Sequence, residues 1–316
     1  MLKTRIIQNE PTGAGRSPSI IEVDGLSKDY GSVRAVDRLS FSVSAGTITG
    51  FLGANGSGKT TTLRALLGLV APTEGNCRID GRRYRDLRRP LSTVGSMLEA
   101  TTHPARTARN HLAMLAAEAG ASRSRVGSLL ELVELDAAAD RRVGGFSLGM
   151  RQRLGLAGAL MGDPAVLILD EPANGLDPEG IRWLREFLRG LAAEGRTILL
   201  SSHVLAEVAQ TVDDVVVIKA GRLVTQAPLD TLLAAHASHQ VRVRTAQPNV
   251  LVTALAAAGF TAIAGPDGAV VVTGCPPEQI GRLALEHGLV LSEITDETPS
   301  LEDTFLALTT QSEEIR

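Results

Sequence analysis

Hydrophobic and polar positions follow two different periods along this chain. The first ordered segments are residues 20–23 and 26–30, and the alternation of apolar and polar residues over 34–43 predicts a strand pair with one face in water. An unbroken apolar run at residues 165–169 predicts a strand that is buried on both faces, as in a parallel sheet, and a short apolar run at residues 48–52 that leads into glycine predicts a second buried strand. Because helical spacing follows each run, the sequence predicts an α/β domain in which strands alternate with helices.

The remaining elements of this domain are predicted in the same way. Helices are expected at residues 58–69, 107–119, 126–135, 181–193 and 204–212, and strands at 197–200, 215–219 and 222–224. Thr107 suits an N-cap, since its hydroxyl can accept a hydrogen bond from the first turn. The second and third helices belong to an all-helical insert between about residues 95 and 160.

The pattern changes after about residue 237. Strands are predicted at residues 241–244, 260–264, 269–273 and 289–294, and helices at 250–258 and 278–287. This βαββαβ order suggests a small α+β domain, and Ser300 with Asp303 predicts a last short helix through a capping-box-like pair. The expected organisation is a disordered tail at 1–19, a catalytic domain at 20–237 and an accessory domain at 238–316.

The composition supports an aliphatic core. Hydrophobic residues make up 44% of the 316 residues and aromatic residues only 3%. The net charge of −3 gives no bulk attraction to nucleic acid or anionic lipid, so no nucleic-acid partner is expected. Residues 1–19 lack the apolar region of a signal peptide, and no apolar stretch reaches the ~18 residues that a membrane span needs. A membrane process would require a membrane part from another chain.

Two further features are expected to be structural. Cys77 and Cys275 lie far apart without metal-ligand spacing, which favours reduced thiols of a cytosolic protein over a lone disulfide. The basic cluster at residues 82–89 is interpreted as a solvated loop, with binding of RNA or lipid head groups as the alternative.

A glycine-rich segment follows the strand predicted at residues 48–52 and opens the next helix. It fits the phosphate-binding P-loop pattern, in which glycines allow backbone N–H groups to wrap phosphate oxygens. Lys59 would supply a charge for the β- and γ-phosphates, and the Thr60 hydroxyl would bind Mg²⁺. The residues predicted to bind nucleotide here are Gly53, Ala54, Asn55, Gly56, Ser57, Gly58, Lys59, Thr60 and Thr61.

Two acids follow the second apolar run. At the tip of a buried strand, Asp170 would hold Mg²⁺ through water, and Glu171 would orient and deprotonate an attacking water. His203 follows the strand predicted at 197–200 and would hold that water and Glu171 in register. Alone, the two acids are equally well explained as an ordinary strand end, and a histidine after a strand is usually structural. The phosphate loop favours the catalytic interpretation.

Ser147 and Gly149 open the helix that runs to about Met161. A serine N-cap followed by glycine leaves a helix N-terminus that can bind an anion. A single domain with one phosphate loop does not need a second anion site, so an ordinary capped helix is the alternative.

Taken together, these motifs resemble the nucleotide-binding subunits of ABC transporters over about residues 20–237. The motifs that carry the resemblance are the phosphate loop, Ser147-Leu-Gly149, Asp170-Glu171, Asn174-Gly-Leu-Asp177 and His203. The resemblance implies ATP as nucleotide and Mg²⁺ as cofactor. It also implies that Ser147 and Gly149 of one copy close on the γ-phosphate held by another copy. Asp177 would contact that copy, and Tyr30 would stack on adenine unless it is an ordinary half-buried tyrosine.

The chain departs from the family pattern at two places. The signature, usually Leu-Ser-Gly-Gly-Gln, is Phe146-Ser-Leu-Gly-Met150 here, which keeps the serine and one glycine. The usual glutamine that senses Mg²⁺ and the membrane partner falls near residues 97–100, where Glu99 offers a carboxylate to the metal. Both changes, together with the C-terminal domain, look like a bacterial exporter branch that includes bacitracin-type and lantibiotic systems.

The expected protein is an ATP-hydrolysing subunit that works as a homodimer and powers export through a separate transmembrane permease. It would lie in the cytoplasm, on the inner face of the membrane. One alternative is a soluble ABC ATPase acting on ribosomes or DNA, although such proteins usually carry two cassettes or a long coiled coil. A non-catalytic ATP switch is the other, against which Glu171 and His203 argue.

Overall fold

A computed structural model describes residues 19–98, 102–204, 208–236, 240–265 and 268–297. The expected tail, except Ser19, and the expected helix at Ser300 lie outside these ranges, as does part of the helix expected at 204–212. The chain divides into two compact units, one of Met1–His203 with Val216–Gln226 and the other of Val204–Val215 with Ala227–Arg316. Each unit is described separately below.

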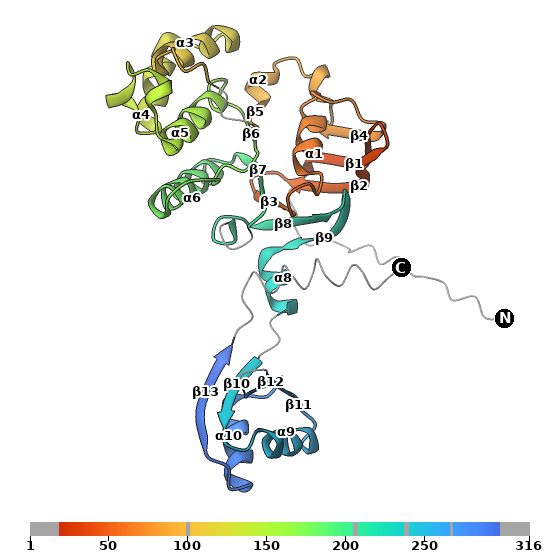
Figure 1. The fold of residues 1–316 in the computed structure, drawn as a ribbon. Coiled ribbons are helices and arrows are strands. Elements are labelled where there is room, and N and C mark those ends of the chain that lie inside the picture. Colours follow the sequence, from red (N-terminus) through yellow and green to blue (C-terminus); the bar gives the residue numbers. More distant parts are fainter. Residues whose placement is uncertain (1–18, 99–101, 205–207, 237–239, 266–267, 298–316) are drawn as a thin grey trace, which may run out of the picture. The chain divides into compact units, whose positions relative to one another are not determined.

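Six strands form the main sheet (Figure 1). In spatial order they are β5 (Val94–Met97), β6 (Val166–Leu169), β7 (Thr197–Ser202), β3 (Ile48–Leu52), β8 (Asp214–Lys219) and β9 (Arg222–Pro228). The first four pair in parallel. β3 and β6 are buried along their whole length, as their apolar runs predict. Their carboxyl ends therefore meet at one edge of the sheet.

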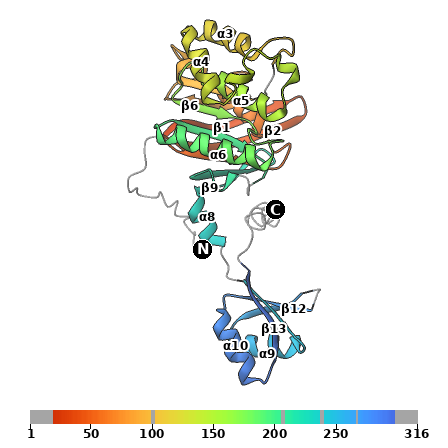
Figure 2. The same cartoon turned by 90° about the vertical axis from the view of Figure 1, so that its left-hand side faces the viewer.

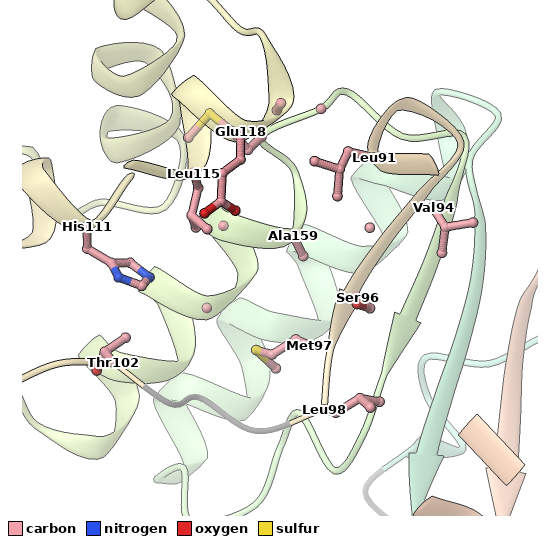
Figure 3. A pocket seen from close by; sticks show the side chains of 16 residues that line it. Leu91, Val94, Ser96, Met97, Leu98, Thr102, His111, Leu115, Glu118 and Ala159 are labelled. Atoms are coloured by element: carbon pink, nitrogen blue, oxygen red, sulfur yellow. The ribbon is translucent and has the colours of Figure 1, made fainter. Parts of the chain in front are cut away.

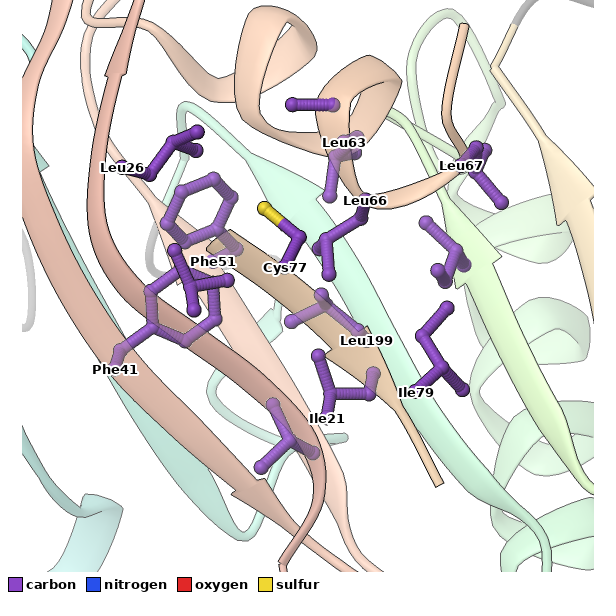
Figure 4. Close-up of a cluster of buried hydrophobic side chains, with 14 of the residues drawn as sticks. Ile21, Leu26, Phe41, Phe51, Leu63, Leu66, Leu67, Cys77, Ile79 and Leu199 are labelled. Atoms are coloured by element: carbon purple, nitrogen blue, oxygen red, sulfur yellow. The ribbon is translucent and has the colours of Figure 1, made fainter. Parts of the chain in front are cut away.

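A second sheet packs over the first. Its strands are β2 (Val33–Ser44), β1 (Ser19–Tyr30) and β4 (Glu74–Ile79), in that antiparallel order. The core between the sheets also includes helix α1 (Lys59–Leu66), and in it the rings of Phe41 and Phe51 stack at 5.1 Å (Figure 4). Cys77 lies in the same core as a free thiol, and burial raises its pKa to about 12.

Three helices form a group of their own (Figure 1): α3 (Ala108–Ala119), α4 (Arg123–Leu132) and α5 (Leu148–Ala159). Their N-caps are Thr107, Ser122 and Ser147, whose side chains accept hydrogen bonds from the first turns. Because of its cap, α4 begins three residues before the predicted start. The other helical elements of this unit are α2 (Pro90–Thr93), α6 (Pro178–Ala193) and the 3₁₀ turns Tyr84–Asp86, Asp136–Ala138 and Val143–Gly145.

The smaller unit contains α8 (Leu229–His236) and a four-stranded antiparallel sheet (Figure 2). The sheet order is β11 (Thr261–Ala264), β12 (Ala269–Thr273), β10 (Gln240–Thr245) and β13 (Leu291–Glu297). Helices α9 (Pro248–Ala257) and α10 (Pro277–Glu286) complete a βαββαβ unit, as predicted. Its core joins alternate β10 and β12 residues to the helices and includes Cys275, a free thiol. The predicted fold class is confirmed.

Gly95 leaves no room for a side chain between β5 and α5. A Cβ atom there would overlap the backbone oxygen of Ala159 and lie 2.8 Å from Cγ of Pro164. Gly95→Ala is expected to lower the free energy of unfolding by about 1–3 kcal/mol, measured by urea denaturation. Gly127→Ala is a control of opposite sign, because Gly127 lies within α4 with open space around it. That change should raise stability by about 0.5–1 kcal/mol. Equal changes in the free energy of unfolding for the two variants would contradict the close contact described at Gly95.

Candidate active site

The phosphate loop joins the carboxyl end of β3 to the first residue of α1. Gly58, the N-cap of α1, has a φ of 103°, which L side chains rarely adopt. A Cβ atom at Gly58 would also lie only 2.6 Å from the backbone oxygen of Ala35. The loop therefore needs glycine at this position, and it leaves the N–H groups of the first turn of α1 available to an anion.

The Lys59 ammonium lies inside this loop, with only 6% of the residue exposed. Its Nζ donates hydrogen bonds to the carbonyl oxygens of Gly53 at 2.7 Å and Ala54 at 3.3 Å, and it lies 3.3 Å from Oε1 of Glu171. A buried charge needs such partners. The contacts join the phosphate loop directly to the predicted catalytic acid.

The two predicted acids leave β6 at the same edge of the sheet. The Thr60 hydroxyl donates to Oδ2 of Asp170 at 2.7 Å, and Nδ1 of His203 lies 2.8 Å from Oε2 of Glu171. Lys59, Thr60, Asp170, Glu171 and His203 thus form one contact network, although they come from three separate regions of the chain.

The donor set at Thr60 and Asp170 fits Mg²⁺. A hydroxyl and a carboxylate are hard oxygen ligands, which this ion prefers. Among the described residues, no cluster of three or more His, Cys, Asp or Glu surrounds a metal position. A cation here would complete its shell with water and phosphate oxygens, as Mg²⁺ commonly does. Glu99, the third predicted ligand, lies outside the described residues.

Ser147 and Gly149 line a different cavity, of about 470 Å³, together with Asp177. The Ser147 hydroxyl accepts the Met150 N–H at 3.2 Å, and Asp177 caps α6 by accepting the Gly180 N–H at 2.9 Å. Ser147 itself is exposed. The N-terminus of α5 therefore faces solvent, where it can meet an anion held by another molecule.

Tyr30 is 47% exposed, and Nζ of Lys28 lies 5.0 Å from the centre of its ring. A ring that is exposed to this extent suits stacking on a base. The hairpin of β1 and β2, which contains Tyr30, is linked to the phosphate loop by two backbone hydrogen bonds of Gly221. The Asp37 N–H donates to Gly221 O, and the Gly221 N–H donates to Ser57 O, both at 2.9 Å. Hydrogen bonds from Arg222 and then Arg34 hold the pKa of Asp37 below its ordinary value.

Sequence reasoning missed Ser201 and Asp37. Ser201 lies fully buried in β7, where its hydroxyl donates to Oδ1 of Asp170 and accepts the N–H of Glu171 at 2.9 Å. The available signal was a pair of serines ending an apolar strand just before His203. Asp37 is a charged residue within an alternating strand, which the pattern alone assigns to the wet face.

A phosphate loop with a buried lysine, a hydroxyl–carboxylate pair and a second acid held by a histidine defines a P-loop nucleoside triphosphatase. Comparison with known proteins agrees. A family model described as ABC transporter matches residues 36–174, and a model of a domain of unknown function (DUF8746) matches residues 239–302.

Curated relatives extend the match. The bacitracin transport ATP-binding protein BcrA of Bacillus licheniformis is 45% identical over 68% of this chain and 71% of its own length. The protein of the same name from Enterococcus faecalis is 36% identical over 92% of this chain and 96% of its own. The lantibiotic transport ATP-binding protein SrtF of Streptococcus pyogenes is 36% identical over 67% and 92%.

A solved ATP-binding subunit of an ABC transporter superposes with a TM-score of 0.62 and 30% identity, over 69% of this chain and 93% of that one. This chain belongs to the ATP-binding subunits of ABC transporters, and it binds and hydrolyses ATP as they do. The bacitracin and lantibiotic relatives confirm the predicted exporter branch. Within the part of the chain that the structure describes, no helix has the length and apolar character to cross a membrane.

Proposed function

We propose that two copies of this chain sandwich two ATP molecules and that the cycle of closure and hydrolysis powers export through a separate membrane subunit. The observation that carries the chemistry is the network in which Glu171 touches both Lys59 and His203. Lys59 and the N-terminus of α1 bind the phosphates. Mg²⁺, held by Thr60 and Asp170, would neutralise phosphate charge. Glu171 takes a proton from the attacking water, and His203 keeps that carboxylate in place.

In this proposal, the Lys59 ammonium exchanges one anionic partner, the Glu171 carboxylate, for another, the triphosphate. In the structure, the Lys59 ammonium lies 3.3 Å from Oε1 of Glu171. A triphosphate offers the same ammonium a stronger anion. Glu171 then loses one of its two contacts and keeps the one to His203, so that Oε1 becomes available to water.

Dimerisation is supported by the exposed N-terminus of α5. Ser147 and Gly149 line a cavity that includes no residue of the phosphate loop. A second copy can supply the missing anion if it approaches head to tail, which gives each nucleotide two walls.

Glu171→Gln keeps the shape of the acid but removes its basicity. This variant is expected to bind ATP, to hydrolyse it at least 100-fold more slowly and to accumulate as a dimer, because closure is no longer reversed by hydrolysis. Size-exclusion chromatography with ATP and Mg²⁺ measures the dimer. Glu131→Gln, at an exposed glutamate of α4, is the matched control. If Glu171→Gln binds ATP and stays monomeric, the two-copy site is wrong.

Gly149→Asp separates stability from function. Gly149 lies in the first turn of α5, and a Cβ atom there meets nothing closer than 3.5 Å. A carboxylate at a helix N-terminus stabilises the helix but repels a γ-phosphate. The melting temperature should therefore stay level or rise, while ATPase activity falls at least ten-fold. Gly149→Asn, which has the same size without the charge, should lose less. Equal activity of the two variants would argue against phosphate contact.

A groove offers a docking place for the membrane partner (Figure 3). It has a volume of about 240 Å³ and is lined by β5, α3 and α5, with Leu98 and Leu115 among its apolar residues. His111 also lines it, and burial lowers the pKa of this histidine. The groove is also lined by Met97 and Leu98, which belong to the segment where the family resemblance expects the contact with the membrane partner. A short amphipathic helix of the permease suits its size and polarity.

Leu115→Glu places a charge in this groove, away from the ATP site. It is expected to abolish co-purification with a co-expressed permease partner while leaving basal ATPase activity within two-fold. Leu132→Glu is the control, since Leu132 is 49% exposed on α4 and does not line the groove. Retention of the permease by Leu115→Glu would place the docking surface elsewhere.

A further inference from the structure

Ser201 joins the two acids of the site through one hydroxyl group. Its Oγ donates to Oδ1 of Asp170 and accepts the backbone N–H of Glu171 at 2.9 Å. The residue is 0% exposed, so water cannot replace either bond. The other oxygen of Asp170 is engaged by Thr60. Thr60 and Ser201 therefore each donate one hydrogen bond to the Asp170 carboxylate, and the bond to Oδ1 comes from the buried serine.

The direction of these bonds is chemically determined. An ionised carboxylate only accepts hydrogen bonds, so the Ser201 hydroxyl must donate its hydrogen to Asp170. Its lone pairs then face the Glu171 N–H. Charge on Asp170 and the position of the Glu171 backbone are thus linked through the same oxygen atom.

Glu171 also has an unusual backbone. Its φ is +48°, a left-handed conformation that costs free energy for a residue with a side chain. Two hydrogen bonds hold the backbone here: the Glu171 N–H donates to Ser201 Oγ, and the Glu171 carbonyl accepts the Asn174 N–H at 3.1 Å. The Glu171 side chain is aimed toward Lys59 and His203 by the backbone so held.

We propose that Ser201 is a positioning residue for ATP hydrolysis: it sets the orientation of the Mg²⁺-binding carboxylate of Asp170 and the backbone of Glu171 together. This inference rests on the proposed function, because it needs hydrolysis by Glu171. Ser201 does not touch the nucleotide in this scheme and acts through the two acids.

The chain contains a matched control. Ser27 is also 0% exposed, and its hydroxyl accepts the backbone N–H of Arg38 at 3.0 Å. Arg38 has the same left-handed φ of 48°. Ser27→Ala therefore removes a buried serine hydroxyl from an equivalent backbone conformation, but it lies in β1, away from both acids. The loss of stability that follows from removing such a hydrogen bond should therefore appear in both variants.

The experiment compares Ser201→Ala, Ser27→Ala and wild type as full-length chains. For Ser201→Ala, kcat should fall at least ten-fold while KM for ATP changes less than two-fold. The Mg²⁺ concentration that half-saturates binding of a fluorescent ATP analogue should rise about three-fold or more, and this readout does not require hydrolysis. Ser27→Ala should lower the melting temperature to a similar extent without either change. If Ser201→Ala does not fold, Ser201→Cys keeps the side-chain shape with weaker hydrogen bonds and replaces it.

Three outcomes would overturn the inference. The first is that Ser201→Ala keeps more than half of the wild-type kcat, the second is that it leaves the Mg²⁺ dependence unchanged, and the third is that Ser27→Ala loses activity equally. The proposed function is judged separately, by hydrolysis in wild type and its loss in Glu171→Gln. Activity that disappears in Glu171→Gln but persists in Ser201→Ala would remove only the role given to Ser201.

Discussion

Parallel pairing of β3, β7 and β6 is the constraint on which the site depends. Leu52 at the end of β3 pairs with Ser202, and Leu169 at the end of β6 pairs with Leu200. Because parallel strands end on the same side, the residues that follow them must share one edge. The phosphate loop and the two acids become neighbours there, although more than a hundred residues separate them along the chain. Loss of this register would separate Lys59 from Glu171 before any side chain changed.

The edge brings two carboxylates together, and their repulsion must be balanced. Both oxygens of Asp170 accept hydrogen bonds from hydroxyl groups, and both oxygens of Glu171 contact nitrogen groups. Every partner is a donor or a cation. In the proposed mechanism, a bound triphosphate would add negative charge to this balance and compete with Glu171 for Lys59. Binding and hydrolysis would then be coupled through one ammonium group.

The sequence predicts a strand or helix well when a recognisable motif or cap residue marks its end. It predicts a short segment poorly when a glycine breaks the pattern of apolar residues. The runs that became β3 and β6 are short, but each ends at a recognisable motif, the phosphate loop or the pair of acids, and the caps Thr107 and Ser147 were visible as single residues. β4 and β5 were missed because Gly75 and Gly95 break short segments; both glycines are required by close backbone approach. Ser201 was missed for another reason. Its role comes from Asp170, 31 residues earlier, and no local pattern contains that contact.

The altered signature still forms a capped helix N-terminus, because the cap needs only the Ser147 hydroxyl and a backbone N–H. The Ser147 hydroxyl caps α5 by accepting the N–H of residue 150, and any side chain at that position, including Met150, supplies the same N–H. Leu148 is 41% exposed and packs so closely on Gly175 that a Cβ atom there would overlap it. The larger residue is therefore accommodated by a glycine in the neighbouring turn. What the family motif preserves is a capped helix N-terminus, and this chain forms one with different side chains.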